Sequence, residues 1–187
     1  LMRGALAYAQ GRGGEAAALL GDIKALSLDP MLGAHVALVQ AELVARSEPR
    51  RAIALLDEAR LLAPGTLIEE AALRRQVSLA GEAGLSEMFE LLSSQYLRRF
   101  PKSFYAGTFR QEFAAEVAGR KNAGDKSNTA KVEAALAHLE PAGRREVYLL
   151  IATEAIARGR MELVRFAAAR TLHLAEPGSA EHTRART

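Results

Sequence analysis

Cysteine and tryptophan are absent from the 187 residues, and aromatic residues make up only 5% of the chain. The lack of cysteine excludes disulfides, thiol catalysis and thiolate metal sites, and it is compatible with both the cytosol and the periplasm. No apolar run reaches the ~18 residues that a membrane-spanning helix needs. Stretches rich in Val, Ile and Thr that could form strands are also missing, so a β-sheet is not expected.

The balance of charge is close to even, with 25 basic and 22 acidic residues and a net charge of +3. This balance does not favour a nucleic-acid backbone as the partner. Ala and Leu dominate the composition, which favours helix. The chain enters a helical pattern directly at Leu1, and no signal peptide is visible. We therefore expect an internal fragment of a longer protein, and a removed targeting segment is compatible with this start.

Apolar residues recur at three- and four-residue steps along nearly the whole chain, which is typical of helices with one buried face. Glycines, prolines and polar clusters divide this pattern into segments. We predict ten helices, at residues 2–10, 13–26, 31–45, 48–62, 66–82, 85–100, 104–119, 128–140, 142–158 and 161–175.

Pairs of neighbouring leucines recur every 36 residues, at 19/20, 55/56 and 91/92. Leu163-Val164 lies two such steps further on. The slot between them, Ser127-Asn128, falls in a predicted polar loop, so Ala135-Leu136 is expected to take its role. Proline also ends helices at similar intervals. Five of the six prolines follow the second helix of a predicted pair, namely Pro30, Pro64, Pro101, Pro141 and Pro177, whereas Pro49 follows a predicted N-cap at Ser47.

A period in the middle thirties with two helices per unit is typical of tetratricopeptide-like repeats. We predict an all-α, right-handed α-solenoid of about five degenerate helix pairs, forming one domain over residues 1–177 with a flexible loop at 119–128 and a polar tail at 178–187. Gln40 departs from the small residue expected at the tightest helix crossing. Thr66 and Glu69 predict a capping box at the start of the fifth helix. The second pair matches the repeat pattern best, at Ala52, Leu56, Ala59 and Pro64.

The stretch "YLRRFPKSFYAGTFRQEF" (96–113) holds six of the ten aromatic residues, interleaved with basic ones. Such a mixture can stack on nucleic acid or can pack between helices. Tyr96 and Phe100 share one helix face, and Tyr105, Phe109 and Phe113 share the next, because residues four apart lie on one side of a helix. We therefore predict a packed aromatic seam, although Tyr105 or a neighbour can still reach a partner.

Several motifs resemble catalytic or ligand sites without the context that such sites need. "GRKNAGDKS" (119–127) has P-loop residues, but a helix precedes it and Asp125 would repel a phosphate. "GRGG" (11–14) is interpreted as a turn between helices. The four histidines have no ligand partner three or four residues away, and no nucleophile context is present. We therefore predict no enzyme activity, no cofactor and no metal.

The residues that could bind a partner are basic and aromatic. Arg74 and Arg75 lie midway along the first helix of the third pair, where solenoids of this type line a concave groove. They can equally be two solvated arginines. The candidate partner-binding residues are Arg74, Arg75, Arg110 and Tyr105.

Two segments, "LLDEARLLAPGTLIEEAALRR" and "YLRRFPKSFYA", resemble the MotC family of periplasmic motility proteins. The resemblance extends over about residues 1–118. It implies a location in the periplasm, an association with the flagellar motor through the periplasmic portion of the stator protein MotB, and assistance by the periplasmic chaperone MotE. These segments are structural, so the resemblance assigns no binding residue.

Two hypotheses about function follow. The first is a non-catalytic scaffold that binds protein partners in the periplasm and is needed for rotation of the flagellar motor. The second is a helical-repeat adaptor in another envelope or cytosolic assembly.

Overall fold

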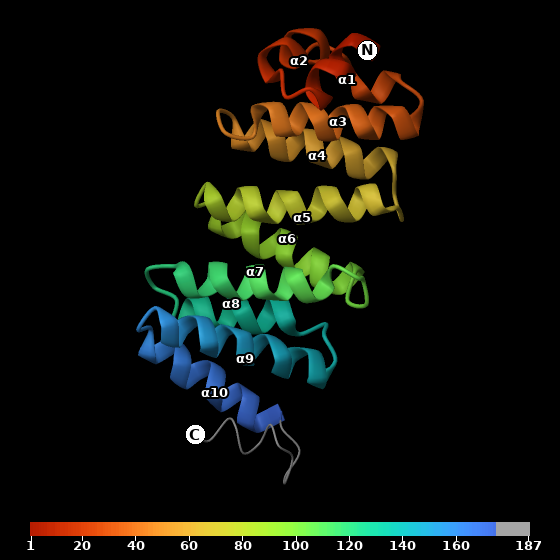
Figure 1. Cartoon of the computed structure of the whole chain (residues 1–187). Helices are drawn as coiled ribbons and strands as arrows, with labels where there is room; N and C mark the ends of the chain where they lie inside the picture. The colour runs from red at the N-terminus through yellow and green to blue at the C-terminus, as the bar shows by residue number, and fades with distance from the viewer. Residues whose placement is uncertain (175–187) are drawn as a thin grey trace. The chain divides into compact units, whose positions relative to one another are not determined.

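The computed structural model describes residues 1–174, and this part of the chain is all-α (Figure 1). Its residues form ten α-helices and one 3-10 turn, without a strand, which confirms the predicted fold class. The elements are α1 (Met2–Ala9), α2 (Gly13–Leu20), η1 (Ala25–Ser27), α3 (Pro30–Val44), α4 (Pro49–Leu62), α5 (Leu67–Glu82), α6 (Ser86–Arg99), α7 (Ala106–Gly119), α8 (Lys126–Leu136), α9 (Pro141–Ala157) and α10 (Met161–Leu174). Pro177 and the predicted polar tail lie outside the described residues.

The chain divides into two compact units, which we call unit 1 (Leu1–Leu92) and unit 2 (Ser93–Thr187). In unit 1, α1 packs on α2, α3 packs on α4, and α4 packs on α5. In unit 2, α9 packs on both α7 and α10. The single repeat domain over residues 1–177 and its right-handed course stay predictions.

The recurring leucine pairs supply the core because one member of each pair faces inward. Leu20, Leu56 and Leu92 are buried, while their preceding neighbours are partly or largely exposed. In α10 the buried member is Leu163, and in α8 both Ala135 and Leu136 are buried, as expected for residues that take over the missing slot. Helices with one buried stripe are stabilised by removing that apolar surface from water.

Three predicted boundaries are wrong. The second helix ends at Leu20 rather than at 26, and η1 replaces its last turn. α3 packs closely on η1 at Gly33, since a Cβ added there would lie only 2.3 Å from the Ala25 carbonyl oxygen. Ser127 and Asn128 lie in the first turn of α8 and not in a loop. The N-cap of α4 is Glu48 rather than the predicted Ser47. Pro49 follows at the first helical position, where a missing N–H costs nothing.

The early end of α2 explains why Gln40 departs from the repeat pattern. The buried amide of Gln40 donates to the carbonyl oxygens of Leu20 and Ile23, at 2.6 and 2.8 Å. Carbonyl groups at a helix end have no partner within their own helix, and burial without one is costly. A side chain from α3 thus completes the end of α2, which a small residue could not do.

A second buried glutamine lies 36 residues later. The amide nitrogen of Gln76 donates to the Ile53 carbonyl oxygen and to Asp57 Oδ1, both at 2.8 Å. Its amide oxygen accepts from Arg60 Nη1 at 2.9 Å. The 36-residue repeat therefore places a buried amide of α5 on α4, as Gln40 of α3 reaches the end of α2.

The predicted start of α5 is confirmed. The Thr66 hydroxyl oxygen accepts from the backbone N–H groups of Ile68 and Glu69, at 3.2 and 3.5 Å. The Glu69 carboxylate accepts from the Gly65 N–H at 2.6 Å, one residue earlier than in the usual capping box. Gly65 adopts φ of +77°, a conformation that favours glycine, and so lets the chain turn from α4 into α5.

Candidate protein-binding site

The aromatic stretch is mainly a packed seam, as predicted. The ring of Tyr96 in α6 stacks on that of Phe109 in α7, with centroids 3.8 Å apart, and Phe100 and Phe113 extend the seam on either side. Tyr96, Phe109 and Phe113 are buried. Their ring faces are therefore occupied by the core of unit 2, which removes them from contact with bases.

Phe104 lies outside the seam, and Tyr105, which was predicted to share the face of Phe109 and Phe113, is largely on the surface as well. Phe104 is 94% exposed, the highest value among the exposed large apolar residues of the described chain. It lies in the loop between α6 and α7, residues 101–105, which we call the Phe104 loop. Its ring packs edge-on against the ring of Tyr105, with centroids 5.3 Å apart, and Tyr105 is itself 40% exposed. The loop therefore presents two neighbouring aromatic rings to solvent.

Arg110, a predicted partner contact, is bonded inside unit 2. Its Nη1 donates to Glu146 Oε2 of α9 at 2.6 Å, and its Nη2 donates to the Pro101 carbonyl oxygen at 3.0 Å. Only 15% of its side chain is exposed. The guanidinium thus ties the Phe104 loop to both α7 and α9.

Arg75, a second predicted contact, forms a bidentate ion pair with Glu42. Its Nε and Nη2 lie 3.1 and 3.3 Å from the carboxylate oxygens of Glu42 in α3, and its Nη1 lies 3.5 Å from Glu82. The pair joins α5 to α3 on a partly exposed face. Arg74 is half-buried beside it. The structure thus places Arg74 and Arg75 in unit 1, and Arg110 and Tyr105 in unit 2.

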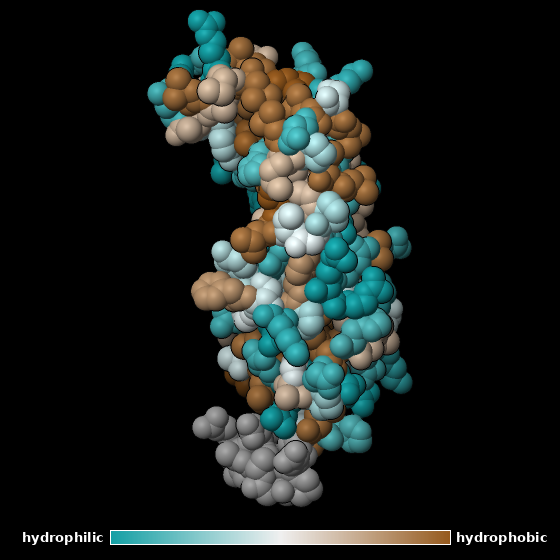
Figure 2. All heavy atoms as spheres, turned by 90° about the vertical axis from the view of Figure 1, so that its right-hand side faces the viewer, coloured by the Kyte–Doolittle hydropathy of each residue, from teal (hydrophilic) through white to brown (hydrophobic). Residues whose placement is uncertain are grey.

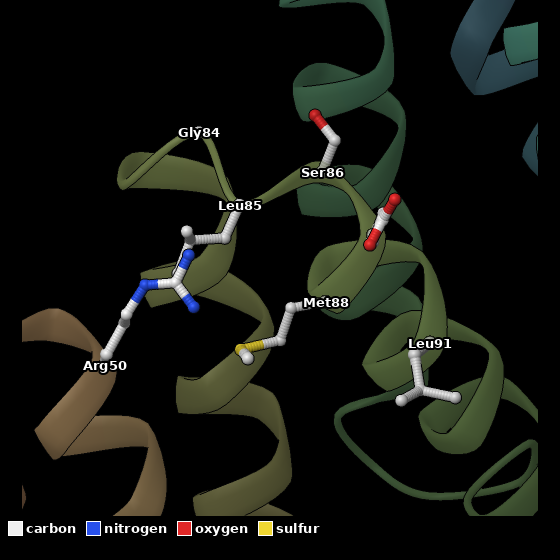
Figure 3. A pocket seen from close by; sticks show the side chains of 7 residues that line it. Arg50, Gly84, Leu85, Ser86, Met88 and Leu91 are labelled. Atoms are coloured by element: carbon white, nitrogen blue, oxygen red, sulfur yellow. The ribbon is translucent and has the colours of Figure 1, made fainter.

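A pocket of about 480 Å³ opens in unit 1 at the turn between α5 and α6. Figure 3 shows Arg50 reaching from α4 toward Leu85, with Met88 and Leu91 along α6. Gly84 forms the turn with φ of +66°. Sequence analysis missed this pocket, because its residues come from two segments that have no shared motif.

Exposed apolar residues are concentrated at the amino-terminal part of unit 1. Figure 2 shows brown, hydrophobic residues gathered over the end that holds α1 and α2. Of the fifteen exposed large apolar residues in residues 1–174, eight fall within positions 1–32: Leu1, Met2, Leu6, Tyr8, Leu19, Leu26, Met31 and Leu32. Apolar surface concentrated in this way is typical of faces that other protein segments cover.

Residues 1–174 contain no group of three or more His, Asp or Glu side chains placed to hold a metal ion. None of the helices in this part is long and apolar enough to cross a bilayer. Burial raises the pKa of the Tyr148 hydroxyl, and the nearby Glu133 carboxylate raises it further, against the opposing effect of Arg170 and Arg144. Tyr148 therefore stays neutral at physiological pH and serves the core of unit 2, where its ring packs edge-on against Phe166.

Comparison with known proteins gives one family. A family model described as "Chemotaxis protein MotC" matches residues 1–187. The chain is also 37% identical over 144 residues to the chemotaxis protein MotC of Rhizobium meliloti (strain 1021). This match covers 77% of the chain and 32% of the relative, so the chain corresponds to about a third of that protein's length. No solved structure matches.

Proposed function

The chain belongs to the MotC family of chemotaxis proteins, and from this premise we propose that it is a non-catalytic scaffold that binds protein in the flagellar motor. We place it in the periplasm, bound to the periplasmic portion of the stator protein MotB and assisted there by the chaperone MotE. Membership of a motility family is the observation that carries the proposal.

Paired helices support a binding role rather than a chemical one. Units built from stacked helix pairs present side chains of successive pairs on one surface, which suits the recognition of an extended partner. In unit 1, α3 and α5 expose the Arg75–Glu42 pair on such a surface. In unit 2, the Phe104 loop presents aromatic rings beside α7. Both features lie at or beside the first helices of predicted pairs.

We propose Arg74, Arg75, Arg110 and Tyr105 as the residues that form the partner site. Arg74 and Arg75 would meet acidic side chains of the partner, since a guanidinium fork matches a carboxylate. Tyr105 would add a half-exposed ring. Arg110 is largely buried, so its part is to hold the loop that carries Tyr105.

The proposal predicts that MotB binding depends on the positive charge of Arg75 and not on the ion pair that Arg75 forms with Glu42. We expect the double replacement Arg74→Ala/Arg75→Ala to weaken binding to the purified periplasmic portion of MotB tenfold or more, because removing one member of a desolvated charge pair costs ~2–5 kcal/mol. Isothermal titration calorimetry on the full chain measures this.

Glu42→Gln is the matched control, because it breaks the same internal pair while leaving the arginine charge in place. It is expected to bind as tightly as the unmodified chain or more tightly. If both variants bind like the unmodified chain, the partner contacts another face. If the unmodified chain does not bind the MotB portion at all, the stator assignment is wrong and the general adaptor hypothesis takes its place.

A further inference from the structure

We propose that Phe104 is an anchor that inserts into an apolar pocket on a partner protein, with partner carboxylates around the rim of that pocket. The inference rests on the proposed function, since it takes a protein as the partner, and it names the residue that would carry most of the binding energy. Phe104 belongs to none of the residues assigned to the site above. Its case is built from exposure, from the bonds that fix its loop, and from the charges around it.

The exposure of Phe104 is unusual because its neighbours are so well buried. Phe109 and Phe113, five and nine residues later, are 1% and 2% exposed, whereas Phe104 is 94% exposed. Folding thus leaves almost the whole ring in water and gains nothing from it. Exposed rings of this kind supply binding energy only when a partner buries them, and interface energy is concentrated in a few such anchors.

The loop that carries the ring is fixed by four hydrogen bonds. Ser103 N–H donates to the Phe100 carbonyl at 3.3 Å, and Ala106 N–H donates to the Ser103 carbonyl at 3.0 Å. Tyr105 N–H donates to the Ser103 hydroxyl oxygen at 3.1 Å, and Arg110 holds the Pro101 carbonyl at 3.0 Å. Because its backbone is already fixed, the loop loses little conformational entropy when a partner binds the ring. An ordered loop with an exposed Phe is therefore a preformed anchor.

Basic residues flank the anchor in the sequence. Arg98 and Arg99 in the last turn of α6 and Lys102 in the loop are all exposed. The guanidinium carbon of Arg99 lies 5.9 Å from the centroid of the Phe100 ring, so its charge lies at the carboxyl-terminal end of α6. A pocket that received Phe104 would bring its rim close to these cations. Carboxylates on that rim would gain from the approach, and the field would steer the encounter.

A protein pocket fits these observations better than a bilayer or a single-stranded nucleic acid. Stable attachment to a membrane surface takes two strong signals, and one exposed Phe beside a half-exposed Tyr provides little apolar area. Binding of single strands uses several stacking platforms along a basic groove. Here the rings of Tyr96, Phe109 and Phe113 are inside the core.

The test compares Phe104→Ala with Ile156→Ala, an exposed apolar residue of α9 in the same unit that is 62% exposed. Binding of the full chain to the purified periplasmic portion of MotB is measured by calorimetry, and swimming is measured in a motC-deletion strain that carries each variant. We expect Phe104→Ala to weaken binding tenfold or more and to reduce swimming at unchanged protein level. Ile156→Ala should behave like the unmodified chain.

Three other outcomes separate the ideas. If the unmodified chain binds MotB and Phe104→Ala binds equally well, the anchor is wrong and the proposed function stands. If the unmodified chain does not bind MotB, the proposed function is wrong, and the swimming assay then tests the anchor by itself. Swimming that is reduced by Phe104→Ala but not by Ile156→Ala supports an anchor for another motility protein. Normal swimming of the Phe104→Ala strain overturns the anchor. Phe104-dependent binding to phosphatidylglycerol vesicles or to oligo-dT would also overturn it.

Arg110→Lys separates positioning from direct contact. Lysine keeps the charge but lacks the planar fork that holds the Pro101 carbonyl and Glu146 together. If Arg110 positions the Phe104 loop, Arg110→Lys weakens MotB binding several-fold, and limited proteolysis at residues 101–105 becomes faster. If binding and proteolysis of Arg110→Lys are both unchanged, the loop does not depend on Arg110.

Discussion

Phe109→Ala is expected to lower the free energy of unfolding of unit 2 by about 3–5 kcal/mol, because truncation of a buried Phe leaves a cavity as well as losing apolar burial. The Phe109 ring is stacked at 3.8 Å on Tyr96 and continues to Phe113, so neighbouring side chains cannot readily fill the space. Most domains are stable by only ~5–15 kcal/mol, which makes such a loss large.

Urea unfolding followed by tyrosine fluorescence measures this change. Of the four tyrosines, Tyr96, Tyr105 and Tyr148 lie in unit 2 and only Tyr8 lies in unit 1, so the signal reports mainly on unit 2. Phe104→Ala is the matched control, because its ring is exposed, and its free energy of unfolding is expected to stay within ~0.5 kcal/mol of that of the unmodified chain. Equal midpoints for Phe109→Ala and Phe104→Ala would mean that the seam does not stabilise the unit.

Gln76→Leu is expected to destabilise unit 1 by about 3 kcal/mol, although leucine is apolar and of similar size. The substitution removes the donor to the buried Ile53 carbonyl and the bonds to Asp57 and Arg60. The Ile53 carbonyl keeps its bond within α4, so most of the loss comes from the bonds to Asp57 and Arg60, because a hydrogen bond to a charged group is worth ~1.5–3 kcal/mol. The common assumption that a buried leucine stabilises a helix pair would predict the opposite sign.

The loss of stability in Gln76→Leu is measured by urea unfolding followed by the helical circular dichroism signal. Gln111→Leu in α7 is the control, since Gln111 is exposed and its replacement touches no buried group. The two variants add the same hydrophobic residue, so their difference isolates the buried hydrogen bonds. A Gln76→Leu chain as stable as Gln111→Leu would show that the hydrogen bonds of Gln76 to Ile53, Asp57 and Arg60 do not stabilise unit 1.

Local pattern predicted the helices well. Nine of the ten begin and end within about four residues of the predicted bounds, because apolar spacing, Pro and Gly act within a few residues of where they stand. The aromatic seam followed from four-residue spacing for the same reason. Phe104 also lies four residues after Phe100, but Pro101 ends α6 between them, so the spacing no longer places the two on one face.

What the sequence did not predict depends on distant partners. The early end of α2 is completed by Gln40, which lies twenty residues after Leu20 and donates to the Leu20 and Ile23 carbonyl oxygens. Arg75 and Arg110 were predicted as contacts for a partner. Within the chain, Arg75 pairs with Glu42, 33 residues away, as well as with the nearby Glu82, and Arg110 pairs with Glu146, 36 residues away. No local rule chooses such a partner among 22 acidic residues. The pocket at Arg50 could not be predicted for the same reason, since its lining residues come from α4 and from the turn between α5 and α6, which are far apart in the sequence.

The Gln40 bond also bears on how the chain opens in its native state. α2 has eight residues and α1 has eight, and isolated helices of that length are marginal in water. Their attachment to α3 includes two hydrogen bonds from one amide side chain. The first two dozen residues should therefore open as one cooperative segment, at lower free energy than α3–α5. In native-state hydrogen exchange their amides would lose protection together and first, while the amides of α4 and α5 exchange only in a larger unfolding event.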